Sequence, residues 1–252
     1  MGSGTDFLTA IDQASLRCGE WTAAFEGGER LPATRENIGA ALSYLYDLAC
    51  CVPECRGGDH QVEWLVGRAV SQALAAIQLS NSGFYNESLS LTRGVGEIAN
   101  LLCLLQTTGC IDEWLHSDRK YRLKNFSPVA VRDRLASSAG IVPVCKERYS
   151  ALCEIGTHPV PWSAPGHFTG TGRPMLGQLL QPAGLMVCTN ELALVLAFCC
   201  LYAGLLVGDS RPECRKLARD LVEGAGGLTI LNYVGALEEV NGAPAPSPKS
   251  VQ

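Results

Sequence analysis

The stretch "PAGLMVCTNELALVLAFCCLYAGLLVG", residues 182–208, decides the fold of this chain. Glu191 is its only charged residue, and the seventeen residues after it, 192–208, are uncharged. A helix that is apolar on every side is either the centre of a helical bundle or a membrane span. Seventeen residues fall just short of the usual spanning length. We therefore predict a buried central helix over 182–207, with a span at 190–208 as the lesser alternative.

The rest of the chain carries apolar residues at three- and four-residue spacing, which predicts amphipathic helices. Thr34 is the expected N-cap of the second helix. No stretch alternates well enough to predict a strand. The helices are expected over residues 5–26, 37–52, 59–80, 84–107, 111–120, 143–155, 211–223 and 228–240, with a further helix beginning at Pro128.

The predicted fold class is therefore all-α, a single-domain multi-helix bundle around the apolar helix. We expect one domain over 1–240, in which 1–58 form an N-terminal helical extension and 59–223 form the core bundle. The segment 241–252 is rich in Pro and Ser and is expected to be a disordered tail.

The charge of the chain argues against a nucleic-acid partner. The net charge is −5 and the pI is about 5.4, so no broad basic surface is available for phosphate backbones. The segment "SDRKYRLK", 117–124, is a local exception that we interpret as a solvated surface turn. No DNA is expected, RNA is possible but disfavoured, and a homodimer is left open.

The twelve cysteines are expected to be reduced. The first residues have neither a basic segment nor an apolar core of the secretory kind, so we expect a cytoplasmic protein. Two groups invite comparison with metal sites, namely Cys50, Cys51, Cys55 and His60, and Cys145, Cys153, His158 and His167. The first group lacks the spacing of a structural zinc site, and the second could in principle supply four ligands. In both groups we favour reduced thiols and ordinary surface histidines. We expect no metal and no cofactor.

A pair of charges interrupts the otherwise core-like stretch "ESLSLTRGVGEIANLLCLL", 87–105. Arg93 and Glu97 are four residues apart, which places them on the same face of a helix. An exposed pair would add little stability, whereas a buried pair is costly to desolvate and needs further partners. The two residues are therefore either a polar lock between helices or part of a cleft that offers a cation and a carboxylate to a ligand.

A second polar element is "RYSALCEIGTHPVP", 148–161. Its helix ends at Gly156, and His158 follows immediately before a proline, which favours an extended conformation. A protonated His at this place interacts favourably with the helix dipole. Alternatively, His158 reaches into a cleft and carries a proton near neutral pH. The Gly- and Pro-rich loop 156–182 is long enough to form a lid or a wall of such a cleft.

Together these two elements resemble a family of uncharacterised bacterial all-α proteins that is grouped near the HEPN-like helical domains. The matching residues are Leu91, Arg93, Glu97 and Leu102, then Tyr149, Leu152, Cys153, His158 and Pro159. The resemblance implies a helical fold over about 60–208 and a polar cluster, without an established activity. Cys153 stands where we expect Ser. HEPN ribonucleases carry an Arg and a His four to six residues apart on one helix, and this sequence has no such pair.

We therefore predict a polar cleft that binds a small anionic or nucleotide-like ligand. Arg93, Glu97 and His158 are the candidate catalytic residues. The candidate binding residues are Tyr149, Cys153 and His167. Two alternatives remain open, a non-catalytic interaction or oligomerisation module with a structural Arg-Glu-His lock, and a metal-independent ribonuclease of the HEPN type.

Overall fold

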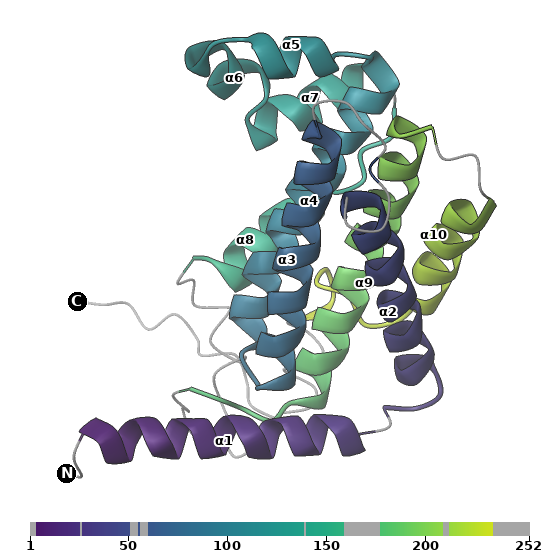
Figure 1. The fold of residues 1–252 in the computed structure, drawn as a ribbon. Coiled ribbons are helices and arrows are strands. Elements are labelled where there is room, and N and C mark those ends of the chain that lie inside the picture. Colours follow the sequence, from purple (N-terminus) through teal and green to yellow (C-terminus); the bar gives the residue numbers. More distant parts are fainter. Residues whose placement is uncertain are drawn as a thin grey trace.

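The computed structural model describes residues 4–25, 27–50, 55, 60–138, 140–158, 177–208 and 212–233. Within these ranges the chain is helical and has no strand, which confirms the predicted all-α bundle (Figure 1). The helices are α1 (Gly4–Ala24), α2 (Arg30–Ala49), α3 (Gln61–Asn81), α4 (Tyr85–Thr108), α5 (Ile111–His116), α6 (Arg119–Asn125), α7 (Pro128–Ser138), α8 (Lys146–Gly156), α9 (Pro182–Leu206) and α10 (Pro212–Gly224). The predicted tail, 241–252, lies outside the described residues.

Helix α9 is the central helix, as predicted. It packs against α2, α3, α4 and α10, and buried residues follow one another along it from Ala183 to Gly204. Of the described helices it alone is long and apolar enough to cross a membrane, but 78% of its most apolar window is buried inside the protein. Burial of this kind is consistent with the core helix of a soluble protein.

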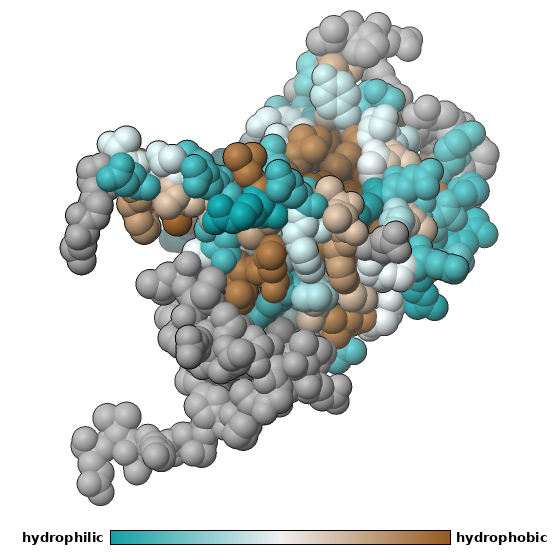
Figure 2. All heavy atoms as spheres, turned by 90° about the horizontal axis from the view of Figure 1, so that it is seen from below, coloured by the Kyte–Doolittle hydropathy of each residue, from teal (hydrophilic) through white to brown (hydrophobic). Residues whose placement is uncertain are grey.

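Around α9 the long helices α2, α3, α4 and α10 run side by side, whereas α1 crosses the lower end of the bundle (Figure 1). The start of α1 projects beyond the other helices (Figure 2). Near its other end Thr22 is buried, and its hydroxyl donates to the carbonyl of Asn81 at the end of α3, at 3.2 Å. The boundary expected at residue 58 stays a prediction, and α2 contributes to the same core as α3 and α4.

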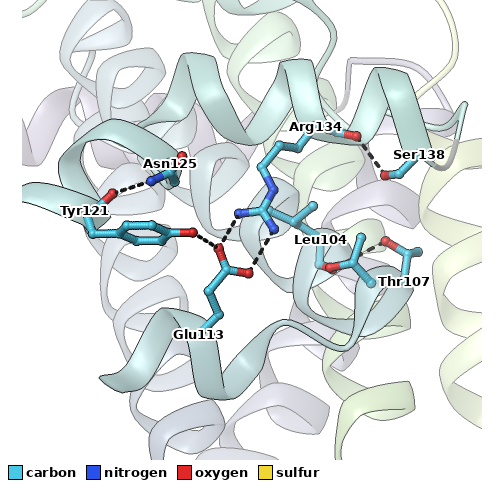
Figure 3. Close-up of polar contacts among 8 residues, drawn as sticks. Leu104, Thr107, Glu113, Tyr121, Asn125, Arg134 and Ser138 are labelled. Carbon is cyan, nitrogen blue, oxygen red and sulfur yellow. Dashed lines mark hydrogen bonds and ion pairs between the residues drawn. The ribbon is translucent and has the colours of Figure 1, made fainter. Parts of the chain in front are cut away.

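The segment predicted as one helix over 111–120 is two helices instead. Ser117 and Asp118 are extended, and the Asp118 carboxylate accepts a hydrogen bond from the amide of Tyr121 at 2.8 Å, which caps α6. Glu113 of α5 then joins α5 to both α6 and α7. It accepts from the Tyr121 hydroxyl at 2.9 Å and from both terminal nitrogens of Arg134 on α7 at 3.3 and 3.2 Å (Figure 3).

One further local prediction is wrong, and another is wrong at its start. Thr34 does not cap α2, which begins at Arg30. The buried Thr34 hydroxyl lies 2.9 Å from the carbonyls of both Arg30 and Gly224, so it joins α2 to the end of α10. In the segment expected as a helix over 228–240, residues 228–232 are not helical and 230–232 form a turn, where the amide of Ile230 donates to Glu191, whereas Tyr233 is helical. Residues 234–240 are not among those described.

Candidate functional site

The candidate site lies where the short helix α8 packs against the middle of α4. The two helices approach closely at the end of α8. A Cβ on Gly156 would lie 2.8 Å from the backbone nitrogen of Ser90, a distance that real Cβ atoms do not show. The absence of a side chain at Gly156 therefore sets how near α8 can come to α4.

Three side-chain contacts join α4 to α8 in order, and we call these six residues the polar row. The hydroxyls of Ser90 and Thr157 are 3.2 Å apart, the Nη1 of Arg93 donates to the Cys153 sulfur at 3.4 Å, and the Tyr149 hydroxyl donates to Glu97 at 3.0 Å. From one contact to the next, the residue number increases along α4 and decreases along α8. The two helices therefore run antiparallel, and the row is a continuous stripe between them.

A buried amide fixes the register of this row. Asn100, one turn beyond Glu97 on α4, donates to the carbonyl of Val144 at 3.1 Å and accepts from the amide of Val144 at 2.9 Å. Val144 lies two residues before α8 begins. Because one side chain satisfies both backbone groups of Val144, α8 starts at a defined height along α4.

Arg93 and Glu97 are close but do not satisfy each other. The Nε of Arg93 is 3.8 Å from the Oε1 of Glu97, too long for a hydrogen bond. This Nε is buried and has no hydrogen-bond partner among the described residues. The two side chains are 26% and 30% exposed, so each also meets solvent. The pair is therefore neither a sealed lock nor an ordinary surface ion pair.

A second guanidinium, from Arg132 on α7, completes the cluster. Its Cζ lies 3.9 Å from the centre of the Tyr149 ring, and that of Arg93 lies 5.8 Å from the same ring. Cations close to an aromatic ring are attracted by it. The Nη1 of Arg132 is buried without a hydrogen-bond partner in the described chain. Two guanidiniums thus lie close to the Tyr149 ring, and the Tyr149 hydroxyl is hydrogen-bonded to the Glu97 carboxylate.

Sequence reasoning did not find Arg132. It follows the buried Val131 in a short helix whose other arginine, Arg134, forms an ion pair with Glu113. Neither spacing nor composition distinguishes the two arginines. The two arginines differ only in the folded protein, where α7 packs against α4, Arg132 lies next to Tyr149 of α8 and Arg134 pairs with Glu113.

Tyr149 acts in the row as a hydrogen-bond donor. Burial raises the pKa of its hydroxyl, and the nearby Glu97 carboxylate raises it further because a tyrosinate would be repelled there. The hydroxyl therefore keeps its proton at neutral pH and holds Glu97. For Arg93, burial works to lower the pKa, but the contact with Cys153 and the charge of Glu97 outweigh it and raise the pKa.

Of the predicted site residues, Arg93, Glu97, Tyr149 and Cys153 come together. His158 is exposed just beyond α8, and its ring has no hydrogen bond or ion pair among the described residues. His167 and most of the loop 156–182 lie outside the described residues. Within the part of the chain that the structure covers, no three His, Cys, Asp or Glu residues lie close enough together to hold a metal ion.

A second polar contact of α8, also missed from the sequence, reaches the core helix. Arg148 forms an ion pair with Glu191, the only charge in α9, whose side chain is 0% exposed. The Oε1 of Glu191 also accepts from the amide of Ile230 at 2.9 Å, whereas its Oε2 is buried without a partner in the described structure. Adjacent residues of α8 thus contact different helices, Arg148 reaching α9 and Tyr149 reaching α4.

The geometry of the row favours recognition of negative charge. Guanidinium groups bind carboxylates and phosphates through several N–H groups at once. Arg93 and Arg132 each have a nitrogen without a hydrogen-bond partner among the described residues. Comparisons with protein-family models, with curated proteins and with solved structures found no match to this chain. Functional inference therefore rests on the residues of this chain.

Proposed function

We propose that the protein binds a small anionic group, a phosphate or a phosphate-bearing ligand, at the polar row between α4, α7 and α8. The observation that carries this proposal is the pair of guanidiniums next to the Tyr149 ring, with Cζ of Arg93 5.8 Å and Cζ of Arg132 3.9 Å from its centre. The Arg93 and Arg132 side chains are also partly exposed, so solvent reaches them. An anion there would offset positive charge and accept charge-assisted hydrogen bonds from the guanidiniums.

Glu97 and Tyr149 have a positioning role in this proposal. The Tyr149 hydroxyl holds Glu97 at 3.0 Å, and Glu97 lies 3.8 Å from the Nε of Arg93. A carboxylate at this distance orients the guanidinium without occupying its hydrogen-bonding edge. The anion would then meet an arginine whose conformation is already restricted, which reduces the entropy lost on binding.

The proposal concerns binding and assigns no reaction. His158 is close in sequence to Thr157 of the row, which supports a role for it near the ligand, but its exposed ring contacts no other described group. Arg93, Glu97 and Tyr149 are also among the residues that carry the resemblance to the family of uncharacterised all-α proteins grouped near the HEPN-like helical domains, whereas Cys153 stands where Ser is expected. We propose a cytoplasmic location, because every cysteine that the structure describes is a free thiol.

The test is calorimetric titration of the protein with inorganic phosphate, pyrophosphate and adenosine monophosphate. Arg93→Gln and Arg132→Gln should each weaken binding by about 10- to 100-fold, since each removes a charged hydrogen-bond donor. Arg219→Gln is the matched control, because it removes one positive charge from the exposed surface of α10. It should leave the affinity unchanged.

Folding of each variant is measured beside binding. If the wild-type protein binds none of the three anions and Arg93→Gln lowers the melting temperature, the row is a structural contact and the proposal fails. If Arg219→Gln weakens binding as much as the other two variants, the binding follows net charge and not this site. Cleavage of RNA that is lost in His158→Ala would instead favour the ribonuclease alternative.

A further inference from the structure

A second site lies on the other side of the bundle, where α2, α3 and α9 pack against one another. It is a pocket of about 200 Å³. One stripe from each helix lines it, and the full lining is Arg35, Ile38, Gly39, Leu42, Ile77, Ser80, Asn81, Cys188, Thr189 and Leu192. None of these residues belongs to the polar row, so the pocket is independent of the proposed phosphate site.

The interior of this pocket is apolar. Its walls include Ile38, Leu42, Ile77 and Leu192, and the hydroxyls that line it are already engaged by their own helices. The Ser80 hydroxyl donates to the carbonyl of Ile77 at 3.0 Å, and that of Thr189 donates to Leu185 at 2.9 Å. A ligand group inside would therefore meet mainly hydrocarbon, which favours an apolar chain or ring over a hydrated group.

Cys188 lines the pocket as a thiol and not as a thiolate. Burial raises its pKa to about 12, and the sulfur donates to the carbonyl of Tyr85 at 3.4 Å. A protonated, buried thiol behaves as a small hydrophobic group and is a poor nucleophile. Nothing in the described lining is therefore arranged for covalent chemistry, and the pocket is suited to reversible binding.

The single charge in the lining is Arg35. Its Nη2 donates to the side-chain oxygen of Asn81 at 3.3 Å, and it has no ion pair with a described carboxylate. Asn81 is itself held in place, because its carbonyl accepts from the buried Thr22 of α1. Arg35 is thus an oriented, partly exposed cation beside an apolar pocket, and no carboxylate among the described residues pairs with it.

We propose that this pocket binds a small amphipathic carboxylate, whose carboxylate group pairs with Arg35 and whose aliphatic or aromatic part enters between α2, α3 and α9. Size supports this class of ligand. An apolar cavity of about 150 Å³ holds one benzene molecule, so the somewhat larger pocket here accommodates a chain of roughly six to eight carbons. For a ligand of this size we expect a Kd on the order of 0.1 mM.

The test titrates the protein with sodium octanoate, with acetate and with 1-octanol, by calorimetry or by chemical-shift changes in NMR spectra. Octanoate should bind measurably and acetate should not, since acetate lacks the apolar part. Arg35→Gln should weaken octanoate by about tenfold or more and leave 1-octanol unchanged. Ile77→Phe, which fills the pocket, should weaken both.

Two controls distinguish binding in this pocket from binding elsewhere on the protein. Arg93→Gln alters the polar row and should leave octanoate binding unchanged, and Arg219→Gln removes one charge from α10 with the same expected result. The proposal fails if octanoate gives no saturable signal, or if neither Arg35→Gln nor Ile77→Phe changes its affinity. Because Arg35 is partly exposed and Ile77 lies at the edge of the core, circular dichroism of both variants shows whether the fold is retained.

Discussion

Replacing Arg148 by Met removes the charged partner of a carboxylate that solvent does not reach. Glu191 is 0% exposed, and after the change its Oε1 would keep only the amide of Ile230, at 2.9 Å, while Oε2 has no described partner. Breaking a buried ion pair costs about 3–5 kcal/mol. Arg148 itself is 18% exposed, so some water already reaches the pair. We therefore expect the lower part of that range, about 3–4 kcal/mol.

Urea unfolding followed by circular dichroism measures this loss. With a slope of about 2–3 kcal/mol per molar urea, the midpoint should fall by about 1–2 M. Lys216→Met is the matched control on α10. It breaks an ion pair with Asp220 that is 2.6 Å long, but Lys216 is 73% exposed. Exposed pairs of this spacing contribute about 0.5 kcal/mol or less.

A double variant isolates the buried charge as the cause. Arg148→Met with Glu191→Leu removes both charges and leaves the amide of Ile230 as the unsatisfied group, which costs about 1–3 kcal/mol. The double variant should therefore be no less stable than Arg148→Met alone, although it carries one more change. If Arg148→Met is as harmless as Lys216→Met, the Glu191 carboxylate is not dry and the reasoning is refuted.

Three further outcomes are expected. Gly156→Ala should destabilise the protein by about 1–3 kcal/mol in urea unfolding, because the new Cβ meets the α4 backbone at 2.8 Å, whereas Gly67→Ala, whose Cβ would meet its neighbour at 3.8 Å, should stabilise it by up to about 1 kcal/mol. Partial burial works to raise the pKa of Glu113, but hydrogen bonds from the neighbouring Tyr and Arg outweigh it and lower the pKa. Ionised Glu113 therefore stabilises the folded protein above about pH 4.5, and this stabilisation is lost as the pH falls further. As the pH is lowered, the urea midpoint of Glu113→Gln should therefore fall less steeply than that of the wild-type protein. Iodoacetamide at about pH 8 should alkylate the exposed Cys55 in the folded protein and Cys188 only after unfolding, as read by mass spectrometry of peptides, since burial raises the pKa of Cys188 to about 12.

The central helix could be predicted because its signal is composition alone. A stretch with one charge in twenty-seven residues must be covered on all sides, whatever the topology. The split between α5 and α6 could not be predicted in the same way. At this break the Tyr121 amide donates to the Asp118 carboxylate, and Arg122 donates to the carbonyls of Leu115 and Ser117. The periodicity of a short polar segment does not reveal such bonds.

The polar row was predictable only where its residues share a helix or a motif. The four-residue spacing of Arg93 and Glu97 placed both on one face, and the resemblance added Tyr149 and Cys153. Glu191 was visible as the lone charge in an apolar helix, and a buried charge needs a partner. The sequence offers twenty basic residues for that role, and only the tertiary packing selects Arg148.

The ion pair between Arg148 and Glu191 also helps to set the position of the polar row. Residues adjacent in a helix point about 100° apart, so Tyr149 faces α4, on which α8 packs, while the long side chain of Arg148 reaches Glu191 of α9. Leu152 and Ile155 of α8 are buried in the core, but apolar contacts alone tolerate repacking. The bond from Tyr149 to Glu97 and the ion pair from Arg148 to Glu191 do not. Glu191, the single charge of α9, thus helps to hold α8, which carries one side of the proposed anion site. The free-energy cost of desolvating Glu191 is the consequence of placing this charge in the core.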